Sequence, residues 1–181
     1  MYANYFWFIF VRMRNKQIKM KLNETIEFYI RTTSLALSRM YNSIAAKYGI
    51  TQTMGYILTY VSREGTPSTK LAQLLGMKNS SLTRLLKKME QDGCIYRKVS
   101  PEDKRVVKIF LTEKGVAQRK TAKKTVLDFN ERLLNKVDEK EMKIFFKVFD
   151  IIKEQVNVEL GESPLSNFKT ENNINNEQLV Q

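Results

Sequence analysis

The chain has 181 residues, with 31 Lys and Arg against 19 Asp and Glu, a formal net charge of +12 and a pI near 9.7. This length suits one ordinary domain with a real core, and the charge makes a polyanion the expected partner, although part of it serves solubility. The absence of histidine removes imidazole bases and the usual His-containing zinc sites, so we expect no enzyme, no catalytic residue, no cofactor and no metal site.

The first nineteen residues carry an apolar run, Tyr5 to Val11, ahead of several cations. Seven residues cannot span a bilayer, which takes about 20, and a secretory signal would carry its positive charge before the apolar segment. Three interpretations remain: an extension that packs on a membrane surface or in a dimer, an unstructured tail, or a stretch translated ahead of a true start at Met20. We favour the last and expect no membrane partner.

Helical spacing of apolar residues predicts a long first helix over residues 22–48, with Asn23 as N-cap and Gly49 as its end. Thr51 is placed to cap a second helix that ends at Glu64-Gly65. The predicted first helix carries three tyrosines, Tyr29, Tyr41 and Tyr48. They could line a ligand pocket or fill an aromatic core, and spacing alone favours the core.

Residues 66–112 contain two short leucine-patterned helices separated at Gly76. Thr66-Pro67 is expected to start the first, since a proline there loses no hydrogen bond. The apolar stripes are Leu71, Leu74 and Leu75, then Leu82, Leu85, Leu86 and Met89. The outward face of the second helix offers hydroxyls, an amide and cations to a major groove, and we predict that it contacts DNA through Asn79, Ser80, Ser81, Thr83, Arg84, Lys87 and Lys88.

A strand over 95–99, a turn over 100–104 and a strand over 105–111 follow. Two helices and a ribbon are the order of a winged helix-turn-helix, so we predict a mainly α fold with a small β-wing. The predicted DNA contacts of the wing are Arg97, Lys98, Asp103, Lys104 and Arg105. Asp103 would hold the tip and aim the guanidinium of Arg105 into a minor groove; the alternative is a solvated turn with a surface pair worth under about 1 kcal/mol. Residues 63–124 hold sixteen basic and six acidic residues, so the charge lies with this motif.

Two more helices are predicted over 113–160, the first capped by Thr112 and the second by a capping box from Asp138 to Glu141. We expect the last helix and the first to pair two copies of the chain around a twofold axis; the alternative is a monomeric core. The predicted dimer residues are Ile26, Ile30, Met142, Phe145, Phe146, Phe149, Ile152 and Val156. Residues 161–181 are polar and Asn-rich, which indicates a flexible tail.

Four motifs together resemble the multiple antibiotic resistance regulator (MarR) family: L-A-x-x-L-G, S-S-L-T-R-L-L-K-K-M-E-x-D-G, Y-R-K-V-S-P-E-D-K-R and I-F-L-T-E-K-G. The resemblance covers roughly Ile26 to Val156, within a domain of residues 20–160, and its most specific part is Pro101 to Arg105. It implies a homodimeric bacterial repressor that binds near-palindromic operators and is released by a small, often anionic aromatic effector bound between the first helix and the helix-turn-helix. Lys78 departs from the family pattern, where Ser or Thr is common ahead of the recognition helix. Asn79 or Ser80 would then cap the helix.

Two functions compete. A sequence-specific transcriptional regulator explains the polar outward face of the second short helix, whereas a protein-protein interaction module would expose aromatic or aliphatic anchors there. We therefore expect a DNA-binding regulator. Cys94 is the single cysteine, which favours a reducing cytoplasm. We expect it to be structural, the alternative being a redox switch.

Overall fold

The computed structural model describes residues 21–161, so the proposed extension of residues 1–19 and all but the first residue of the proposed tail lie outside the described residues. The chain divides into two compact units, Met1–Gln52 and Thr53–Gln181, and each is described by itself. Among residues 21–161, none of the helices combines the length and the apolarity that crossing a bilayer demands.

The described part of the first unit contains a short 3-10 turn, η1 (Leu22–Glu24), and a long helix, α2 (Ile26–Ala46). Thr25 caps α2, because its hydroxyl accepts a hydrogen bond from the backbone N–H of Phe28 at 3.1 Å. Our assignment of the cap to Asn23 is wrong, since Asn23 lies inside η1. The chain leaves the helix through Gly49, whose φ of +70° explains why a glycine stands there.

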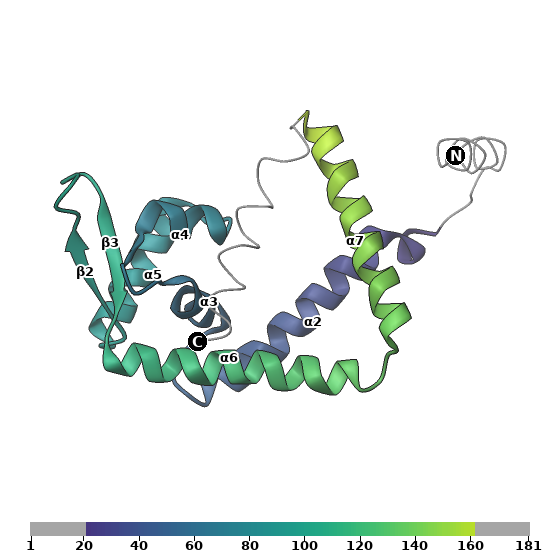
Figure 1. Cartoon of the computed structure of the whole chain (residues 1–181), viewed down its shortest axis with the longest axis horizontal. Helices are drawn as coiled ribbons and strands as arrows, with labels where there is room; N and C mark the ends of the chain where they lie inside the picture. The colour runs from purple at the N-terminus through teal and green to yellow at the C-terminus, as the bar shows by residue number, and fades with distance from the viewer. Residues whose placement is uncertain (1–20, 162–181) are drawn as a thin grey trace. The chain divides into compact units, whose positions relative to one another are not determined.

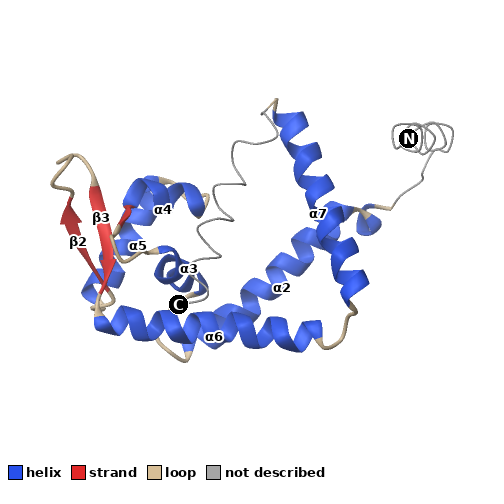
Figure 2. Ribbon diagram, viewed as in Figure 1, coloured by secondary structure: helices blue, strands red, loops and turns tan. Residues whose placement is uncertain are grey.

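The second unit contains the helix-turn-helix and its ribbon (Figures 1 and 2). Its elements are α3 (Gln52–Tyr60), which starts at the unit boundary, β1 (Thr66–Pro67), α4 (Ser68–Leu74), α5 (Asn79–Gln91), β2 (Ile95–Val99), β3 (Val107–Leu111), α6 (Glu113–Leu134) and α7 (Glu139–Leu160). In Figure 1, β2 and β3 form a ribbon whose tip points away from α6. The mainly helical fold with a small β-wing is thus confirmed.

The sheet has three antiparallel strands in the order β1-β3-β2. Thr66 pairs with Ile109 and Pro67 with Lys108, so this dipeptide is an edge strand and not the start of α4, as we predicted. Its hydrogen bonds explain the difference: the buried Thr66 hydroxyl donates to Tyr60 O at 3.1 Å and accepts from Ser62 N at 3.0 Å, which closes the loop after α3. Pro67 occupies the N-cap position of α4, one residue before the predicted place.

The core of this unit is built from α3, α4, α5 and the sheet. The leucine stripes are confirmed at Leu71, Leu82, Leu86 and Met89, each no more than 2% exposed, whereas Leu74, Leu75 and Leu85 are half-buried. They pack in a core with Met54, Ile57, Leu58, Val61, Ile95 and Ile109. This core fixes which side of α5 faces outward.

Both predicted caps of the C-terminal helices are confirmed. Gly115 N donates to the Thr112 hydroxyl at 3.1 Å. Asp138 and Glu141 form a reciprocal capping box, with bonds of 2.7 and 2.9 Å. The apolar stripe of α7 remains largely uncovered by the described residues: Phe145, Phe146 and Val156 are 50%, 58% and 49% exposed, while Met142, Phe149 and Ile152 are half-buried.

Candidate nucleic-acid interface

The exposed residues of α5, the second helix of the helix-turn-helix, are all polar, and Leu85 is half-buried. Its buried residues are Leu82, Leu86 and Met89. All seven predicted contact residues are exposed: Asn79, Ser80, Ser81, Thr83, Arg84, Lys87 and Lys88. The helix begins at Asn79 with Lys78 at the N-cap, and the Lys78 side chain makes no capping bond. Asn79 and Ser80 are therefore helical residues, and our expectation that one of them caps α5 is wrong.

The cations on α5 differ in whether they form an ion pair within the described chain. Lys88 Nζ lies 3.2 Å from the carboxylate of Asp92, one turn on, in an exposed pair. Arg84 and Lys87 form no ion pair with any residue that the structure describes. An exposed ion pair is weak, so Lys88 can leave Asp92 for a DNA phosphate at little cost. Arg84 and Lys87 can bind a phosphate without first breaking an ion pair within the described chain.

The wing tip is a hydrogen-bonded loop. Asp103 Oδ1 accepts from the backbone N–H of Arg105 at 2.9 Å, and Asp103 O accepts from Val106 N at 2.9 Å. Asp103 therefore shapes the backbone at Arg105, as expected, but it does so through the N–H and not through the guanidinium. Both Arg105 and Lys104 are exposed.

A second carboxylate braces the base of the tip. Glu102 accepts a short hydrogen bond from the hydroxyl of the buried Ser100, and its other neighbour is Lys108 Nζ of β3 at 3.7 Å. The Ser100 hydrogen bond, followed by the Lys108 charge, lowers the pKa of Glu102, so this carboxylate is ionised at neutral pH. The brace joins the strand that enters the tip to the strand that leaves it.

Two predicted wing contacts, the half-buried Arg97 and the exposed Lys98, already have partners within the protein. Arg97 Nε lies 3.1 Å from Glu90 Oε2 of α5, and both Nε and Nη2 of Arg97 are buried. Lys98 Nζ lies over the stacked rings of Tyr96 and Phe110, at 5.3 and 5.7 Å from their centroids. The structure thus gathers Asp103, Lys104 and Arg105 at the tip, whereas Arg97 and Lys98 lie along the strand.

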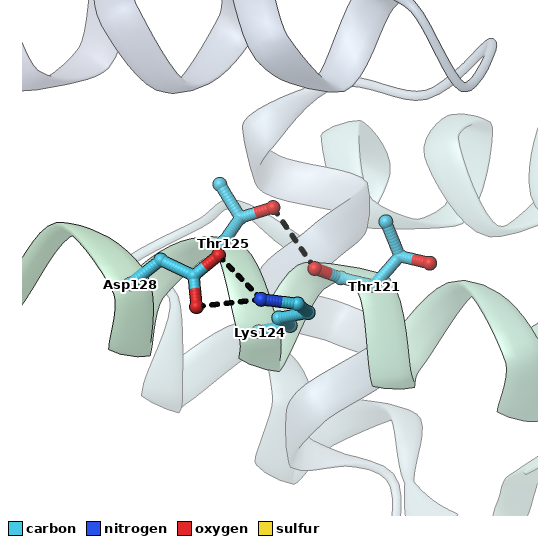
Figure 3. Close-up of polar contacts among 4 residues, drawn as sticks. All are labelled: Thr121, Lys124, Thr125 and Asp128. Atoms are coloured by element: carbon cyan, nitrogen blue, oxygen red, sulfur yellow. Dashed lines mark hydrogen bonds and ion pairs between the residues drawn. The ribbon is translucent and has the colours of Figure 1, made fainter.

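The basic charge continues on α6, where part of it is neutralised locally. Lys124 Nζ contacts both carboxylate oxygens of Asp128, at 2.8 and 2.7 Å (Figure 3). Beside this pair, the Thr125 hydroxyl donates to Thr121 O at 2.9 Å (Figure 3). Lys124 is therefore a cation of α6 whose charge is matched within its own helix.

Sequence reasoning missed two acids that pair with cations of the wing strands: Glu90, which pairs with Arg97, and Glu102, which pairs with Lys108. Glu90 stands on the last turn of α5 and Glu102 in the tip, and in the sequence both are only minority charges of a basic segment. The available signal is the position of Glu90 beside the apolar stripe, next to Met89, where a carboxylate can reach the following strand. No signal predicts the Glu102 brace, because it depends on the fold of the tip.

The remaining predicted residues are the single cysteine and three tyrosines. Cys94 is 1% exposed, and burial raises the pKa of its thiol, which keeps it protonated at neutral pH. Tyr29 and Tyr48 are 61% and 53% exposed, so neither fills the core of the described chain, while Tyr41 is half-buried. Within residues 21–161, no three His, Cys, Asp or Glu residues gather in a metal-binding group.

A polar, cationic recognition helix beside a basic hairpin defines a winged helix-turn-helix of the DNA-binding class. The profile of the MarR family matches residues 50–107. The organic hydroperoxide resistance transcriptional regulator of Bacillus subtilis is 35% identical over 112 residues, which cover 61% of this chain and 76% of that protein. The regulator SarZ of Staphylococcus haemolyticus is 29% identical over 103 residues, covering 56% and 70%.

Solved structures share the fold. The MepR-DNA complex of S. aureus superposes with a TM-score of 0.67 at 20% identity, covering 73% of this chain and 98% of that one. The transcriptional regulator SlyA gives a TM-score of 0.66 at 22% identity, covering 74% and 95%. The chain belongs to the MarR family and is a DNA-binding transcriptional regulator, not an enzyme.

Proposed function

We propose that the protein is a cytoplasmic, homodimeric repressor that binds a near-palindromic operator and is released by a small ligand. The observation that carries the DNA contact is the outward face of α5, where every exposed residue is polar and where Arg84 and Lys87 form no ion pair within residues 21–161. An interaction module would need apolar anchors on this face, and the exposed residues of α5 supply none.

The dimer is supported by the apolar faces of α7 and α2. Phe145 and Phe146 on α7, and Ile26 and Ile30 on α2, are between 37% and 58% exposed. A run of exposed aromatic and aliphatic side chains of this kind is uncommon on a monomer and typical of an interface. A twofold dimer would bring two recognition helices to successive major grooves, about 34–36 Å apart. MepR, which shares the fold, has been solved in complex with DNA, and this supports DNA as the partner.

The contacts then divide by chemistry. Arg84 is proposed to contact a guanine edge, with Asn79, Ser80, Ser81, Thr83, Lys87 and Lys88 contacting neighbouring bases and phosphates. At the wing, Lys104 and Arg105 would enter the minor groove, held by Asp103. Arg97 and Lys98 would act mainly by positioning the strand. The effector site along α2, with Tyr29, Tyr41 and Tyr48, stays a prediction from the family resemblance.

The test begins with DNA selected from a random pool by the full chain. If the proposal holds, the selected sequences contain two inverted half-sites with centres about 10 bp apart, and one dimer binds each site. A reporter driven by a promoter that carries the site should fall when the protein is expressed. Selection of a single half-site bound by one chain would contradict the dimer, and a rise in reporter output would contradict repression.

A further inference from the structure

The start of α6 is hydrogen-bonded to the segment that leaves the recognition helix. Three successive carbonyl oxygens there accept bonds from it. Lys114 Nζ donates to Asp92 O at 2.6 Å, and the Thr112 hydroxyl donates to Gly93 O, also at 2.6 Å. The backbone N–H of Thr112 donates to Cys94 O at 3.1 Å. Carbonyl groups at the C-terminal end of a helix lack partners within the helix, and α6 supplies partners at the end of α5.

Further along, α6 also holds the C-terminal end of α3. Arg119 Nη1 donates at 3.1 Å to the carbonyl oxygen of Val61, the residue that follows α3. A Cβ placed on Gly55 of α3 would lie 3.7 Å from the Cβ of Ala122, so the two helices approach closely. Cations are favoured at the C-terminal ends of helices, where the macrodipole places partial negative charge. Two cations of α6 thus hold the ends of two helices of the DNA-reading unit.

The length of α6 magnifies any rotation at its start. The helix has 22 residues, which at 1.5 Å per residue makes it about 33 Å long. Its far end leads into α7, which carries the apolar face of the proposed dimer. A rotation of about 10° at the start of α6 would displace the far end by about 6 Å, nearly two base pairs at about 3.4 Å each. Small rotations would therefore change the separation of two recognition helices in a dimer.

We propose that Lys114 and Arg119 are positioning residues that set the spacing between the two half-sites of the operator. Neither needs to contact DNA for this role, because each acts by fixing α6 to the helices of the DNA-reading unit. The role rests on the proposed homodimer, since a single chain has no half-site spacing. Loss of either cation should leave the sequence of the half-site unchanged, because the buried Leu82, Leu86 and Met89 still hold α5 in the core.

The probe is a pool of DNA duplexes with about 30 randomised base pairs, enough for two half-sites with centres about 10 bp apart. The full chain and each variant select from this pool separately, and sequencing gives both the half-site and the distance between inverted half-sites. We expect the wild-type chain to select one spacing. Lys114→Met and Arg119→Met should select the same half-site over a range of spacings wider by about two base pairs, as a displacement of about 6 Å implies.

Two controls separate positioning from loss of charge. Lys120→Met removes an exposed cation of α6 and should keep the wild-type spacing. Lys114→Arg retains a charged donor for Asp92 O and should restore the sharp spacing that Lys114→Met loses. Because Lys114 is exposed, its replacement leaves the core intact.

The outcomes distinguish this role from the proposed dimer. If the wild-type chain selects no inverted pair, the dimer fails and the positioning role fails with it. If the wild-type chain selects one spacing and a variant selects it just as sharply, the dimer stands and the positioning role of that residue is overturned. Weaker binding at an unchanged spacing counts against the role in the same way, because it would indicate a phosphate contact instead.

Discussion

Arg97 of β2 and Glu90 of α5 form an ion pair, with Nε 3.1 Å from Oε2, that joins the wing to the recognition helix. Two of its guanidinium nitrogens, Nε and Nη2, are buried, while the side chain as a whole is 29% exposed. Its charge is thus matched before any DNA arrives. Arg97 is suited to fix the angle between wing and helix, whereas Lys104 and Arg105 at the exposed tip are suited to meet phosphate.

This difference predicts a difference in salt dependence. Arg97→Gln should weaken operator binding by loosening the wing, while the slope of log K against log salt stays nearly constant. Lys104→Gln, the matched variant at the tip, should lower the magnitude of the slope by about 1.8 per dimer, because each of the two protomers no longer neutralises one phosphate and each phosphate contributes about 0.9. Fluorescence anisotropy at four salt concentrations measures both. Equal changes of slope in the two variants would show that Arg97 also contacts phosphate.

Gly115, in the first turn of α6, should not tolerate a side chain. A Cβ at this position would overlap the backbone carbonyl oxygen of Cys94, which cannot move aside as a side chain can. We expect Gly115→Ala to lower the free energy of unfolding by about 1–3 kcal/mol, the usual cost of overpacking. Gly55→Ala in α3 is the control, because its Cβ would only meet the Cβ of Ala122 at 3.7 Å. Urea denaturation measures both variants, and equal stability would refute the overlap.

Cys94 should resist alkylation. Burial leaves its side chain 1% exposed and raises the pKa of the thiol, so the reactive thiolate is scarce at neutral pH. We expect iodoacetamide to label the folded protein far more slowly than the urea-unfolded protein, with the folded rate rising only at alkaline pH. Mass spectrometry follows the labelling. Rapid labelling of the folded chain at pH 7 would restore the redox-switch alternative.

Apolar residues repeating with a period of 3.6, together with the turn residues, are enough to predict the helices. The repeat places Leu71, Leu82 and Leu86 on one face of their helices, and that face is the one that is buried. They are not enough for β1. Thr66-Pro67 has the local signature of a helix start, and only its pairing with Ile109 and Lys108, some forty residues on, makes it a strand. Long-range pairing of this kind leaves no local signal.

The candidate interface shows the same division. Exposure of Arg84 and Lys87 follows directly from their place opposite the apolar stripe of α5. The ion pair between Arg97 and Glu90 does not follow from the sequence pattern, because it depends on where β2 lies against α5. Sequence therefore predicts which cations face outward on one element, but not which of them find partners on another.

The α7 surface gives a prediction for assembly. Phe146 is 58% exposed in the chain, so Phe146→Asp should leave the chain folded but place an unpaired charge in the proposed interface, at a cost of several kcal/mol. We expect light scattering to report a monomer. Lys147→Asp, at the next residue, is the matched control and should remain a dimer. A Phe146→Asp protein with unchanged mass would exclude α7 as the interface.

The last prediction separates base contacts from groove contacts. Arg84 is exposed on the second turn of α5 and forms no ion pair within the described chain. It can therefore contact a guanine edge with two of its guanidinium nitrogens, a contact worth roughly 1–3 kcal/mol of discrimination. Arg84→Ala should therefore relax preference at one or two positions of each half-site. Arg105, whose backbone N–H is fixed by Asp103 at 2.9 Å, should sense the width and potential of the minor groove instead.

Arg105→Ala should thus weaken binding evenly across operator variants, more strongly where the flanks are A·T-rich, and should lower the salt slope by about 0.9 for each phosphate that Arg105 neutralises. Asp103→Asn provides an intermediate case, because the amide oxygen still accepts from Arg105 N and should preserve most of the affinity. The measurement is binding of each variant to a panel of singly mutated operators at several salt concentrations. Identical profiles for Arg84→Ala and Arg105→Ala would refute the division of roles, and full affinity in both would refute this DNA-binding surface.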